Sequence, residues 1–559
     1  MQMINAAKQS GSKKDKLFNF RPAFFAAVFL ILGIVFAYYK LLHGASAWWL
    51  LVLLPVAVVP FFFAEGREDA YRRMLALCLL AICFLTGFIA FRSQLNAYAD
   101  CSYYKGDYAV TGTVVEKFKG EQSVLVVLED ITIDGKGEEG KLNAYLPTSF
   151  FEEIQIADVL LIEGYVKTDT DYFGKYGFEA SKIDEGVRYI LSSADGYAVA
   201  GRSDNIFLLV RRRVEQVLYS GMDKTTASVT LAMLMGDTAG IEGSLLDNMR
   251  YGGIAHIFAV SGLHVGALYA FCLLLFDKTK VRCLPKPCRF FLLTLLLVFY
   301  AGVCGFSPSI LRATTLCVVS YFMRLIGSKS DSLNVLGIAA LFILLFTPCA
   351  LFEIGFQLSF MACIGILLLS KRIGQVCDEI YILFRKHFPR RLSEEERKTL
   401  ESGDTLPLTF GEKVWRFFVS VFSASLAAQI TTAPLQYMAF GYLSGWSLLL
   451  NLFCVPLVGA MFALLLALVT VASILPSAWA FYLLYLPKVF WSLLLLLFEV
   501  FDFSAFAVTG IQLSGESCVC YYGGVTFLSD KWNISERQRK TLAFVCFGTF
   551  IVILALLNL

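Results

Sequence analysis

Apolar runs of about twenty residues recur along almost the whole of this 559-residue chain. An α-helix needs a run of that length to cross the hydrocarbon core of a bilayer, where its backbone polar groups must be bonded within the segment. The first three runs cover approximately Pro22–Tyr39, Ala47–Ala64 and Met74–Ala90. With 57% hydrophobic and 17% charged residues, the composition excludes an ordinary soluble protein. The sequence therefore predicts a polytopic α-helical membrane protein with roughly thirteen spans.

The charges divide the chain into parts of opposite sign. Residues 93–205 hold 20 acidic and 10 basic side chains, although the whole chain has a net charge of +3. Residues 1–21 are basic, and cytoplasmic segments of membrane proteins are enriched in Lys and Arg. This N-terminus is therefore predicted to be cytoplasmic. Three spans within residues 22–92 then place the acidic insert, 93–205, on the extracytoplasmic side.

The acidic insert shows the alternation of apolar and polar residues that is typical of β-strands. Five segments have this pattern: Tyr108–Phe118, Gln122–Ile133, Lys141–Leu146, Asp158–Lys167 and Gly186–Leu191. Five strands in about 100 residues predict a small closed barrel of the OB-fold type.

Three glycines of the insert match the phosphate-binding pattern GxGxxG, namely Gly135, Gly137 and Gly140. The acidic residues Glu138 and Glu139 lie within the pattern and would repel a phosphate, and no helix pattern follows it. A hairpin turn is therefore expected here.

After the insert, apolar residues recur at helical spacing between Ile206 and Leu218, with Arg211, Arg212 and Arg213 among them. The pattern predicts an amphipathic helix on the membrane surface, and with a linker helix it makes up residues 206–253. Residues 254–559 are mostly apolar with basic loops, and they are predicted to form the main transmembrane domain. The expected location is the cell (cytoplasmic) membrane, as a multi-pass protein.

The sequence offers little for metal or nucleotide chemistry. It has four histidines, no four-ligand zinc spacing and no GxxxxGK[ST] motif. Ser261 and His264 are adjacent on a helix, but no carboxylate between Ile254 and Phe276 would orient the imidazole, which disfavours an intramembrane hydrolase. We expect no enzyme activity, no metal and no cofactor.

Several polar and glycine-containing blocks interrupt the apolar runs. They are Ala232-Met-Leu-Met-Gly-Asp237, Met249-Arg-Tyr-Gly-Gly-Ile-Ala-His256, Ala259-Val-Ser-Gly-Leu-His-Val-Gly266, Phe306-Ser-Pro-Ser-Ile-Leu-Arg-Ala313, Phe356-Gln-Leu-Ser-Phe360 and Ala433-Pro-Leu-Gln, followed by Asn451 and Pro456. The order of these blocks resembles that of the ComEC-type competence protein family. The resemblance implies a membrane channel that passes single-stranded DNA into the cytoplasm during natural transformation.

The resemblance also implies partners. Besides single-stranded DNA and membrane lipid, we expect an extracytoplasmic DNA receptor and a cytoplasmic ATP-driven helicase or translocase. Many family members continue into a metallo-β-lactamase-like nuclease domain, but this sequence has no His-x-His-x-Asp-His cluster before its end at Leu559. The expectation is a form that lacks that domain, with a separate nuclease.

Polar groups inside apolar runs are the candidates for a DNA path, because a charged strand requires polar or cationic lining groups to cross hydrocarbon. These candidates are His256, Ser261, Gly262, His264, Gly266, Ser307, Pro308, Arg312, Gln357, Asn451 and Lys488. The clusters Ser261–Gly266, Ser307–Arg312, Gln357 and Asn451 are predicted to share one polar cavity.

Structural roles stay open for several of these residues. Arg312 would equally suit an interfacial position or a pair with Glu353, and Lys488 would suit the membrane surface. The amides Gln357 and Asn451 would suit hydrogen bonds between helices. At the level of function, a transporter or flippase for another anionic substrate, such as a lipid-linked glycan, is the alternative.

Overall fold

A computed structural model describes residues 21–43, 70–120, 122–174, 177–192, 194, 196–258, 262–278, 284–327, 331–387, 410–476, 479–529 and 535–558. The predicted second span lies outside these residues, as does the predicted basic N-terminus except for Arg21. The chain forms two compact units. The larger unit contains residues 21–357 and 457–505, and the smaller unit contains residues 358–456 and 506–559.

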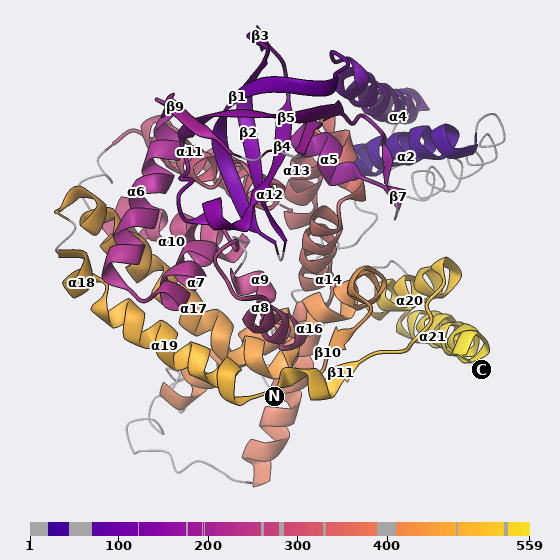
Figure 1. The fold of residues 1–559 in the computed structure, drawn as a ribbon. Coiled ribbons are helices and arrows are strands. Elements are labelled where there is room, and N and C mark those ends of the chain that lie inside the picture. Colours follow the sequence, from indigo (N-terminus) through magenta and orange to yellow (C-terminus); the bar gives the residue numbers. More distant parts are fainter. Residues whose placement is uncertain are drawn as a thin grey trace. The chain divides into compact units, whose positions relative to one another are not determined.

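A mixed sheet of seven strands is the main β-structure of the larger unit (Figure 1). Its strands are β1 (Lys105–Lys119), β2 (Ser123–Ile133), β3 (Lys136–Gly137), β4 (Lys141–Pro147), β5 (Asp158–Thr168), β8 (Val187–Ser192) and β9 (Ala198–Arg202). The five strands that the alternation predicted are confirmed, within a few residues, as β1, β2, β4, β5 and β8. A short hairpin, β6 (Phe173–Gly174) and β7 (Gly177–Phe178), lies apart from the sheet. We call residues 105–202 the sheet domain.

The long strands of the sheet domain pair in a closed circuit. Their order is β1-β2-β4-β8-β5, and β5 pairs with β1 again. The pairing of β4 with β8 is parallel, and the other pairings of the circuit are antiparallel. Strand β9 adds to β5 outside the circuit. Two irregularities in the β1–β2 register, between Thr111 and Thr113 and between Val114 and Glu116, provide the local bending that such closure requires.

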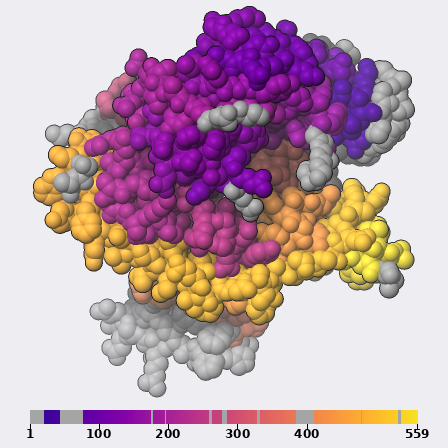
Figure 2. All heavy atoms as spheres, in the orientation of Figure 1, coloured from indigo at the N-terminus to yellow at the C-terminus, as the bar shows by residue number. Residues whose placement is uncertain are grey.

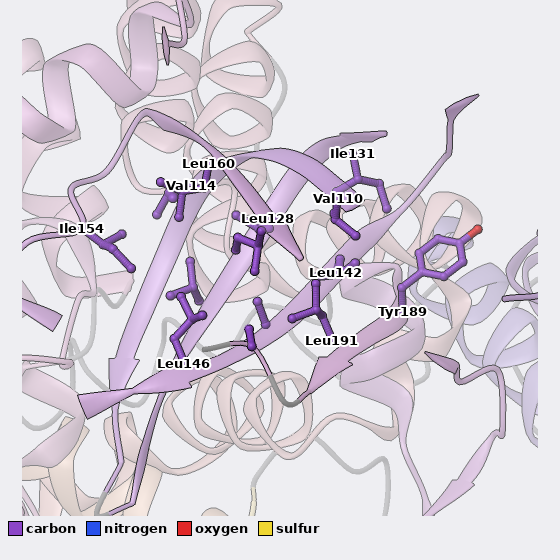
Figure 3. Packing of buried hydrophobic residues seen from close by; sticks show 14 of the residues in the cluster. Val110, Val114, Leu128, Ile131, Leu142, Leu146, Ile154, Leu160, Tyr189 and Leu191 are labelled. Atoms are coloured by element: carbon purple, nitrogen blue, oxygen red, sulfur yellow. The ribbon is translucent and has the colours of Figure 1, made fainter. Parts of the chain in front are cut away.

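The inward-facing residues of these strands form one apolar core, which includes Val110, Leu128, Leu142 and Leu160 (Figure 3). Burial of one such side chain contributes about 1.5 to 3 kcal/mol. Tyr189 lies at one end of the cluster, and its hydroxyl points away from the aliphatic side chains (Figure 3). That hydroxyl donates a hydrogen bond of 3.2 Å to Glu138, so its polar end is satisfied.

The glycine-rich segment after β2 forms the expected hairpin. Ile133 of β2 pairs with Lys136 of β3, which leaves Asp134 and Gly135 as the two turn residues. Both have a positive φ, +49° and +78°. This is the conformation that a tight two-residue hairpin requires and that an Asp-Gly pair readily adopts. The GxGxxG match therefore reflects turn chemistry.

Helices make up the rest of the larger unit. They are α2 (Pro22–His43), α4 (Ala70–Ala99), α5 (Ala180–Glu185), α6 (Ile206–Gly221), α7 (Lys224–Met235), α8 (Gly243–Tyr251), α9 (Ala255–Phe258), α10 (Gly262–Lys278), α11 (Lys286–Val303), α12 (Pro308–Leu325), α13 (Ser332–Phe346), α18 (Ala480–Leu483) and α19 (Tyr485–Val500). Short 3₁₀ segments are η3 (Thr148–Phe151), η5 (Pro348–Phe352) and η7 (Phe503–Phe506). Side chains of Asn205, Asp223 and Asp331 cap α6, α7 and α13 and so satisfy backbone N–H groups at their first turns.

Two glycines allow α2 and α4 to approach each other closely. A Cβ atom at Gly33 would collide with the carbonyl oxygen of Phe84, and one at Gly87 with that of Leu30. Apolar helices in a membrane associate through such close packing, because lipid gives them no hydrophobic driving force toward each other.

The smaller unit consists mainly of five helices. They are α14 (Ile354–His387), α16 (Phe410–Phe440), α17 (Ser447–Ile474), α20 (Gly515–Leu528) and α21 (Glu536–Asn558), with a two-residue strand pair, β10 (Leu443–Ser444) and β11 (Ala507–Val508). Helix α14 begins in the larger unit and α17 ends in it. Pro434 lies inside α16 and cannot bond the carbonyl of Ile430 one turn earlier. The Tyr521 hydroxyl of α20 donates to that carbonyl at 2.7 Å.

Seven of the described helices are long and apolar enough to cross a membrane. They cover Pro22–Leu42, Leu77–Ala99, Lys286–Val303, Ile354–Leu383, Phe410–Phe440, Ser447–Ile474 and Glu536–Asn558. Two further apolar helices, Gly262–Phe276 and Ser332–Phe346, are shorter. The predicted first and third spans coincide with the first two of these helices. The predicted total of roughly thirteen is not confirmed by the described residues.

Candidate functional site

A cavity of about 690 Å³ lies within the larger unit, between the sheet domain and the helices that follow it. Its volume is in the range of small-molecule sites in proteins. Eight charged side chains line it: Glu116, Lys117, Glu179, Glu185, Arg211, Asp237, Arg312 and Glu353. Five are acidic and three are basic, so the lining combines both signs with an acidic excess.

Helix α6 connects the sheet domain to this site through three consecutive arginines. Arg211 enters the cavity, whereas Arg212 binds Asp158 at the start of β5 with 2.6 Å between nitrogen and oxygen. Arg213 donates to the carbonyls of Ser473 and Leu475 at the end of α17, at 3.1 and 3.0 Å. The sequence pattern predicted that these arginines lie on the membrane surface. In the structure they bind groups of the protein instead. In Figure 2 the violet atoms of the sheet adjoin the magenta atoms of α6 and α7 along one face.

Arg211 and Asp237 form a buried ion pair at the cavity. Their side chains are 7% and 8% exposed, and Nη2 of Arg211 lies 3.0 Å from Oδ2 of Asp237. Arg211 also donates through Nη1 to the carbonyl of Val115 on β1, at 3.2 Å. The guanidinium therefore joins three elements, α6, β1 and the turn after α7. Charges removed from water in this way require such close partners.

The backbone holds Asp237 in this position. Helix α7 ends at Met235, and Gly236 adopts the left-handed conformation, with φ +80°. Asp237 then accepts the N–H of Ala239 at 3.1 Å with its other carboxylate oxygen. A glycine is favoured at such a C-terminal position because it has no Cβ to clash. The Gly-Asp pair thus turns the chain and fixes the carboxylate that faces Arg211.

A second tight turn brings Ser307 and Arg312 to the same cavity. After α11, Gly305 and Phe306 both have a positive φ, +73° and +51°, and Ser307 and Pro308 then begin α12. Proline is favoured at the first helical position because its missing N–H has no partner there in any helix. Positive φ is unfavourable for a residue such as Phe306, so the surrounding structure must stabilise this turn.

Arg312 is 2% exposed and lies against the first turn of α14. Its Nη2 donates to the carbonyl of Gly355 at 3.0 Å, and its guanidinium carbon lies 5.7 Å from the ring centre of Phe356. Burial raises the pKa of Glu353, and the positive charge of Arg312 opposes this increase only in part.

The other candidate residues of the larger unit are close by in the fold but do not line the cavity. A Cβ at Gly262 would lie 3.8 Å from Cβ of Ala313, which places α10 beside α12. His264 is buried against Phe462, with 4.6 Å between ring centres. His256 lies in α9 and has an exposed side chain, and Gly266 lies in α10.

Two amides and one lysine have structural partners. Gln357 donates to the carbonyl of Leu351 at 3.1 Å, and Lys488 lies 3.5 Å from a carboxylate oxygen of Asp223. Asn451 belongs to the smaller unit, where it donates to Ser447 within the same helix, at 3.3 Å. Ser261 lies outside the described residues. Of the residues predicted to form the DNA path, Ser307 and Arg312 line the cavity.

The turns at Asp237 and Ser307 lie in a region that is similar to known proteins. The family model for competence proteins matches residues 233–532, which is more than half of the chain and includes Asp237, Ser307 and Arg312. The chain belongs to the competence protein family. As the order of its motifs indicated, it is a ComEC-type protein.

Two relatives show how far this similarity extends. ComE operon protein 3 of Bacillus subtilis (strain 168) is 30% identical over 169 residues, which are 30% of this chain and 21% of the relative. The uncharacterized protein MG316 homolog of Mycoplasma pneumoniae is 33% identical over 122 residues, 21% of this chain and 29% of the relative. The matches therefore span less than a third of either relative. No solved structure matches the chain.

Within the described part of the chain, no three His, Cys, Asp or Glu side chains are arranged to hold a metal ion. The residues that sequence reasoning missed are Arg211, Lys117 and the carboxylates of the sheet domain. Arg211 gave no local signal because its partner is 26 residues away and because two further arginines, Arg212 and Arg213, follow it directly. The sequence signal that could have indicated this pair is the Gly-Asp block at Asp237. An aspartate at the end of an apolar helix requires a partner.

Proposed function

We propose that this protein is a multi-pass protein of the cytoplasmic membrane that passes single-stranded DNA into the cell during natural transformation. Membership of the competence protein family supports this role, and seven helices able to cross a membrane support the location. The protein acts as a channel and catalyses no reaction. Its substrate is a polyanion that must be shielded from hydrocarbon along its path.

In this proposal the sheet domain is an extracytoplasmic barrel of the OB type. The closed circuit β1-β2-β4-β8-β5 supports this assignment, because OB-folds are five-stranded barrels that bind oligonucleotides on one face. Among aromatic residues suited to base stacking, Tyr103 and Phe173 are exposed, whereas Tyr104 and Tyr172 are hydrogen-bonded to Glu138 and to the carbonyl of Leu95.

The observation that carries the proposal is the position of Arg312. It is a buried cation on a helix otherwise rich in apolar residues, and it lines the cavity together with Arg211, Lys117 and five carboxylates. A buried cation requires anionic or dipolar partners, and Arg312 has the carbonyl of Gly355 and the charge of Glu353. A phosphate of a passing DNA strand carries a negative charge, as Glu353 does. It is therefore a suitable partner for Arg312.

The chain requires other proteins for the rest of the process. Its sequence contains no nucleotide-binding motif of the GxxxxGK[ST] type, so an ATP-driven helicase or translocase in the cytoplasm supplies the movement. An extracytoplasmic receptor delivers the DNA. A separate nuclease degrades the strand that is not transported.

Arg312→Glu tests the proposal. We expect this variant to abolish uptake of labelled DNA while its expression and membrane insertion stay normal, and we expect Arg312→Lys to retain part of the uptake. Arg324→Glu is the matched control, because Arg324 lies on the same helix and is exposed. Normal uptake by Arg312→Glu would remove Arg312 from the DNA path. Normal uptake without the protein would favour the alternative of a transporter for another anionic substrate.

A further inference from the structure

Three helices of the smaller unit meet at one end of α20. Arg372 of α14 donates to the carbonyl of Leu528, the last residue of α20. Arg539 of α21 donates to the next carbonyl, that of Ser529, at 2.9 Å. The Ser529 hydroxyl in turn donates to the carbonyl of Leu368 on α14, at 3.2 Å. Two arginines from distant parts of the chain thus converge on one helix end.

These contacts have a structural role of their own. The last carbonyls of a helix have no partner within it, and arginine side chains can satisfy them. The contacts also fix where the positive charge lies. Arg539 is 8% exposed, and the two guanidinium groups are bonded to consecutive carbonyls, so neither cation can leave the other without loss of a hydrogen bond.

Two further cations, Arg537 and Lys540, lie on the exposed part of the first turns of α21. Lys540 forms an ion pair with Glu536 at 2.8 Å, but both side chains are exposed, so water screens the pair and another anion can displace Glu536. Together with Arg372, the first five residues of α21 carry four positive charges and one negative charge. We call Arg372, Arg537, Arg539 and Lys540 the basic cluster.

The basic cluster lies at the edge of an apolar span. The 18 residues 541–558 contain no charged side chain. At 1.5 Å per residue they cover about 27 Å, which is close to the thickness of the hydrocarbon core. Basic residues gather at the cytoplasmic ends of membrane helices. In a membrane the basic cluster is therefore level with the lipid headgroups of the cytoplasmic leaflet.

An apolar surface continues directly from these cations. One side of α21 presents Arg537, Lys540, Phe544, Gly548 and Ile551, which recur at intervals of three and four residues. Phe544 and Ile551 are 79% and 62% exposed, and a Cβ atom at Gly548 between them would meet no atom within 4 Å. An acyl chain can lie along this side of the helix while its headgroup contacts the two cations.

The opposite side of α21 packs against α20 (Figure 1). A Cβ atom at Gly524 of α20 would lie 2.9 Å from the ring of Phe547, which shows how closely the helices approach. The rings of Tyr521 and Phe550 lie 5.3 Å apart between the same helices. The side that carries Phe544 is therefore the side that faces lipid.

We propose that the basic cluster is a binding site for an anionic phospholipid of the cytoplasmic leaflet, with the lipid phosphate at the cations and an acyl chain along the exposed side of α21. The inference rests on the membrane location in the proposed function and adds a ligand to it. Because the cations come from both α14 and α21, the bound headgroup strengthens the attachment between these two helices.

A DNA strand is the other polyanion that a basic cluster attracts. Contacts to a strand at its phosphates require cations, but they require no apolar surface beside them. A phospholipid requires both, and basic sites between membrane helices on the cytoplasmic side are typical of its anionic forms. Phe544 also lies inside the apolar span, which acyl chains fill. These features favour the lipid.

The test is native mass spectrometry of the purified full-length protein with dioleoylphosphatidylglycerol and, separately, with dioleoylphosphatidylcholine. The two lipids have the same acyl chains and differ in headgroup charge. We expect the protein to retain phosphatidylglycerol about tenfold more strongly or better, since each basic residue near an anionic headgroup contributes about fivefold. Glycerol 1-phosphate, which has no acyl chain, and a single-stranded thymidylate 12-mer should not displace the lipid at equal concentration.

Arg537→Gln with Lys540→Gln is the main variant, because both side chains are exposed and their loss preserves the packing of α21. We expect its retention of phosphatidylglycerol to fall about tenfold or more, while retention of phosphatidylcholine stays the same. Arg537→Gln alone should show about a fivefold fall, and it serves if the double variant is unstable. Lys413→Gln with Arg416→Gln is the matched control, since it removes two exposed cations from α16 of the same unit.

The outcomes separate the lipid site from the proposed function. Equal retention of the two lipids by the unchanged protein, or an unchanged preference in the double variant, would overturn the lipid site and leave the channel proposal in place. Displacement of phosphatidylglycerol by the thymidylate 12-mer would assign the basic cluster to the DNA strand instead. The uptake assay of Arg312→Glu does not depend on these results, so each proposal can fail without the other.

Discussion

Nη2 of Arg211 and Oδ2 of Asp237 lie 3.0 Å apart in a buried ion pair that joins helix α6 to the turn after α7. Loss of one partner would leave the other charge buried without compensation. We therefore expect Arg211→Ala or Asp237→Asn to lower the free energy of unfolding by about 3 to 5 kcal/mol. Thermal unfolding of the purified protein in detergent measures this change as a lower midpoint.

The exposed pair of Arg250 and Asp247 is the matched control, because it is also an arginine–aspartate contact, at 2.9 Å. Arg250→Ala should cost about 0 to 1 kcal/mol, since water screens exposed charges. A double change, Arg211→Met with Asp237→Leu, should cost less than either single loss. Equal effects at the two pairs would show that burial does not strengthen the Arg211 contact.

Stability should also depend on pH through Asp184. Burial raises the pKa of Asp184 from its ordinary value of 3.8 to about 8 in the folded protein. Between these values the unfolded chain has released a proton that the folded protein retains, so this contribution is full below pH 4 and is lost as the pH approaches 8. The loss amounts to at most about 1.4 kcal/mol per pH unit.

Unfolding midpoints measured from pH 5 to 9 test this dependence. The unchanged protein and the control Asp171→Asn should both lose stability as the pH rises, whereas Asp184→Asn should have a flatter profile. Parallel profiles for all three proteins would show that Asp184 ionises normally in the folded state.

Two tyrosines of α20 should stabilise the proline-containing helix α16 in the smaller unit. The hydroxyls of Tyr521 and Tyr522 donate to the carbonyls of Ile430 and Thr431, at 2.7 and 3.0 Å. Removal of one hydroxyl leaves a half-buried acceptor without this partner, at a cost of about 1 kcal/mol. We expect Tyr521→Phe to lower the unfolding midpoint, and Tyr482→Phe, at an exposed site, to leave it unchanged.

The proposed orientation of the sheet domain has a direct test. Lys136 lies in the hairpin after β2 with a side chain that is 65% exposed. In Lys136→Cys, a membrane-impermeant thiol reagent should label intact cells, because the domain is placed outside. The protein without the added cysteine gives the background from its own 15 cysteines. Labelling that requires permeabilised cells would reverse the topology.

The strands and the hairpin were predictable because their signals are local. Alternation along β1 and β2 reports which side chains face the core, and Asp134 with Gly135 specifies the turn between β2 and β3. Arg312 was recognisable from the sequence as a candidate site residue for a related reason. A charged side chain within an apolar run requires a partner wherever it lies in the fold.

The partners in the cavity were not predictable from local patterns. Glu185 lies in a helix of six residues and lines the cavity together with Glu353 from a distant part of the chain, and neither position differs locally from an exposed carboxylate. Arg211 belongs to a regular amphipathic pattern that suits a membrane surface as well as a protein interface. Only the tertiary fold decides between these environments.

The three arginines of α6 also fix the rotational register of that helix. Consecutive residues of an α-helix point about 100° apart, so Arg211, Arg212 and Arg213 reach their partners in three different directions. A turn of α6 about its own axis would break all three attachments at once. A tilt that carries the sheet domain with it would preserve the link between Arg212 and Asp158. Arg212 and the bond from Arg211 to Val115 thus attach α6 to the sheet domain, whereas Arg213 attaches the same helix to the end of α17.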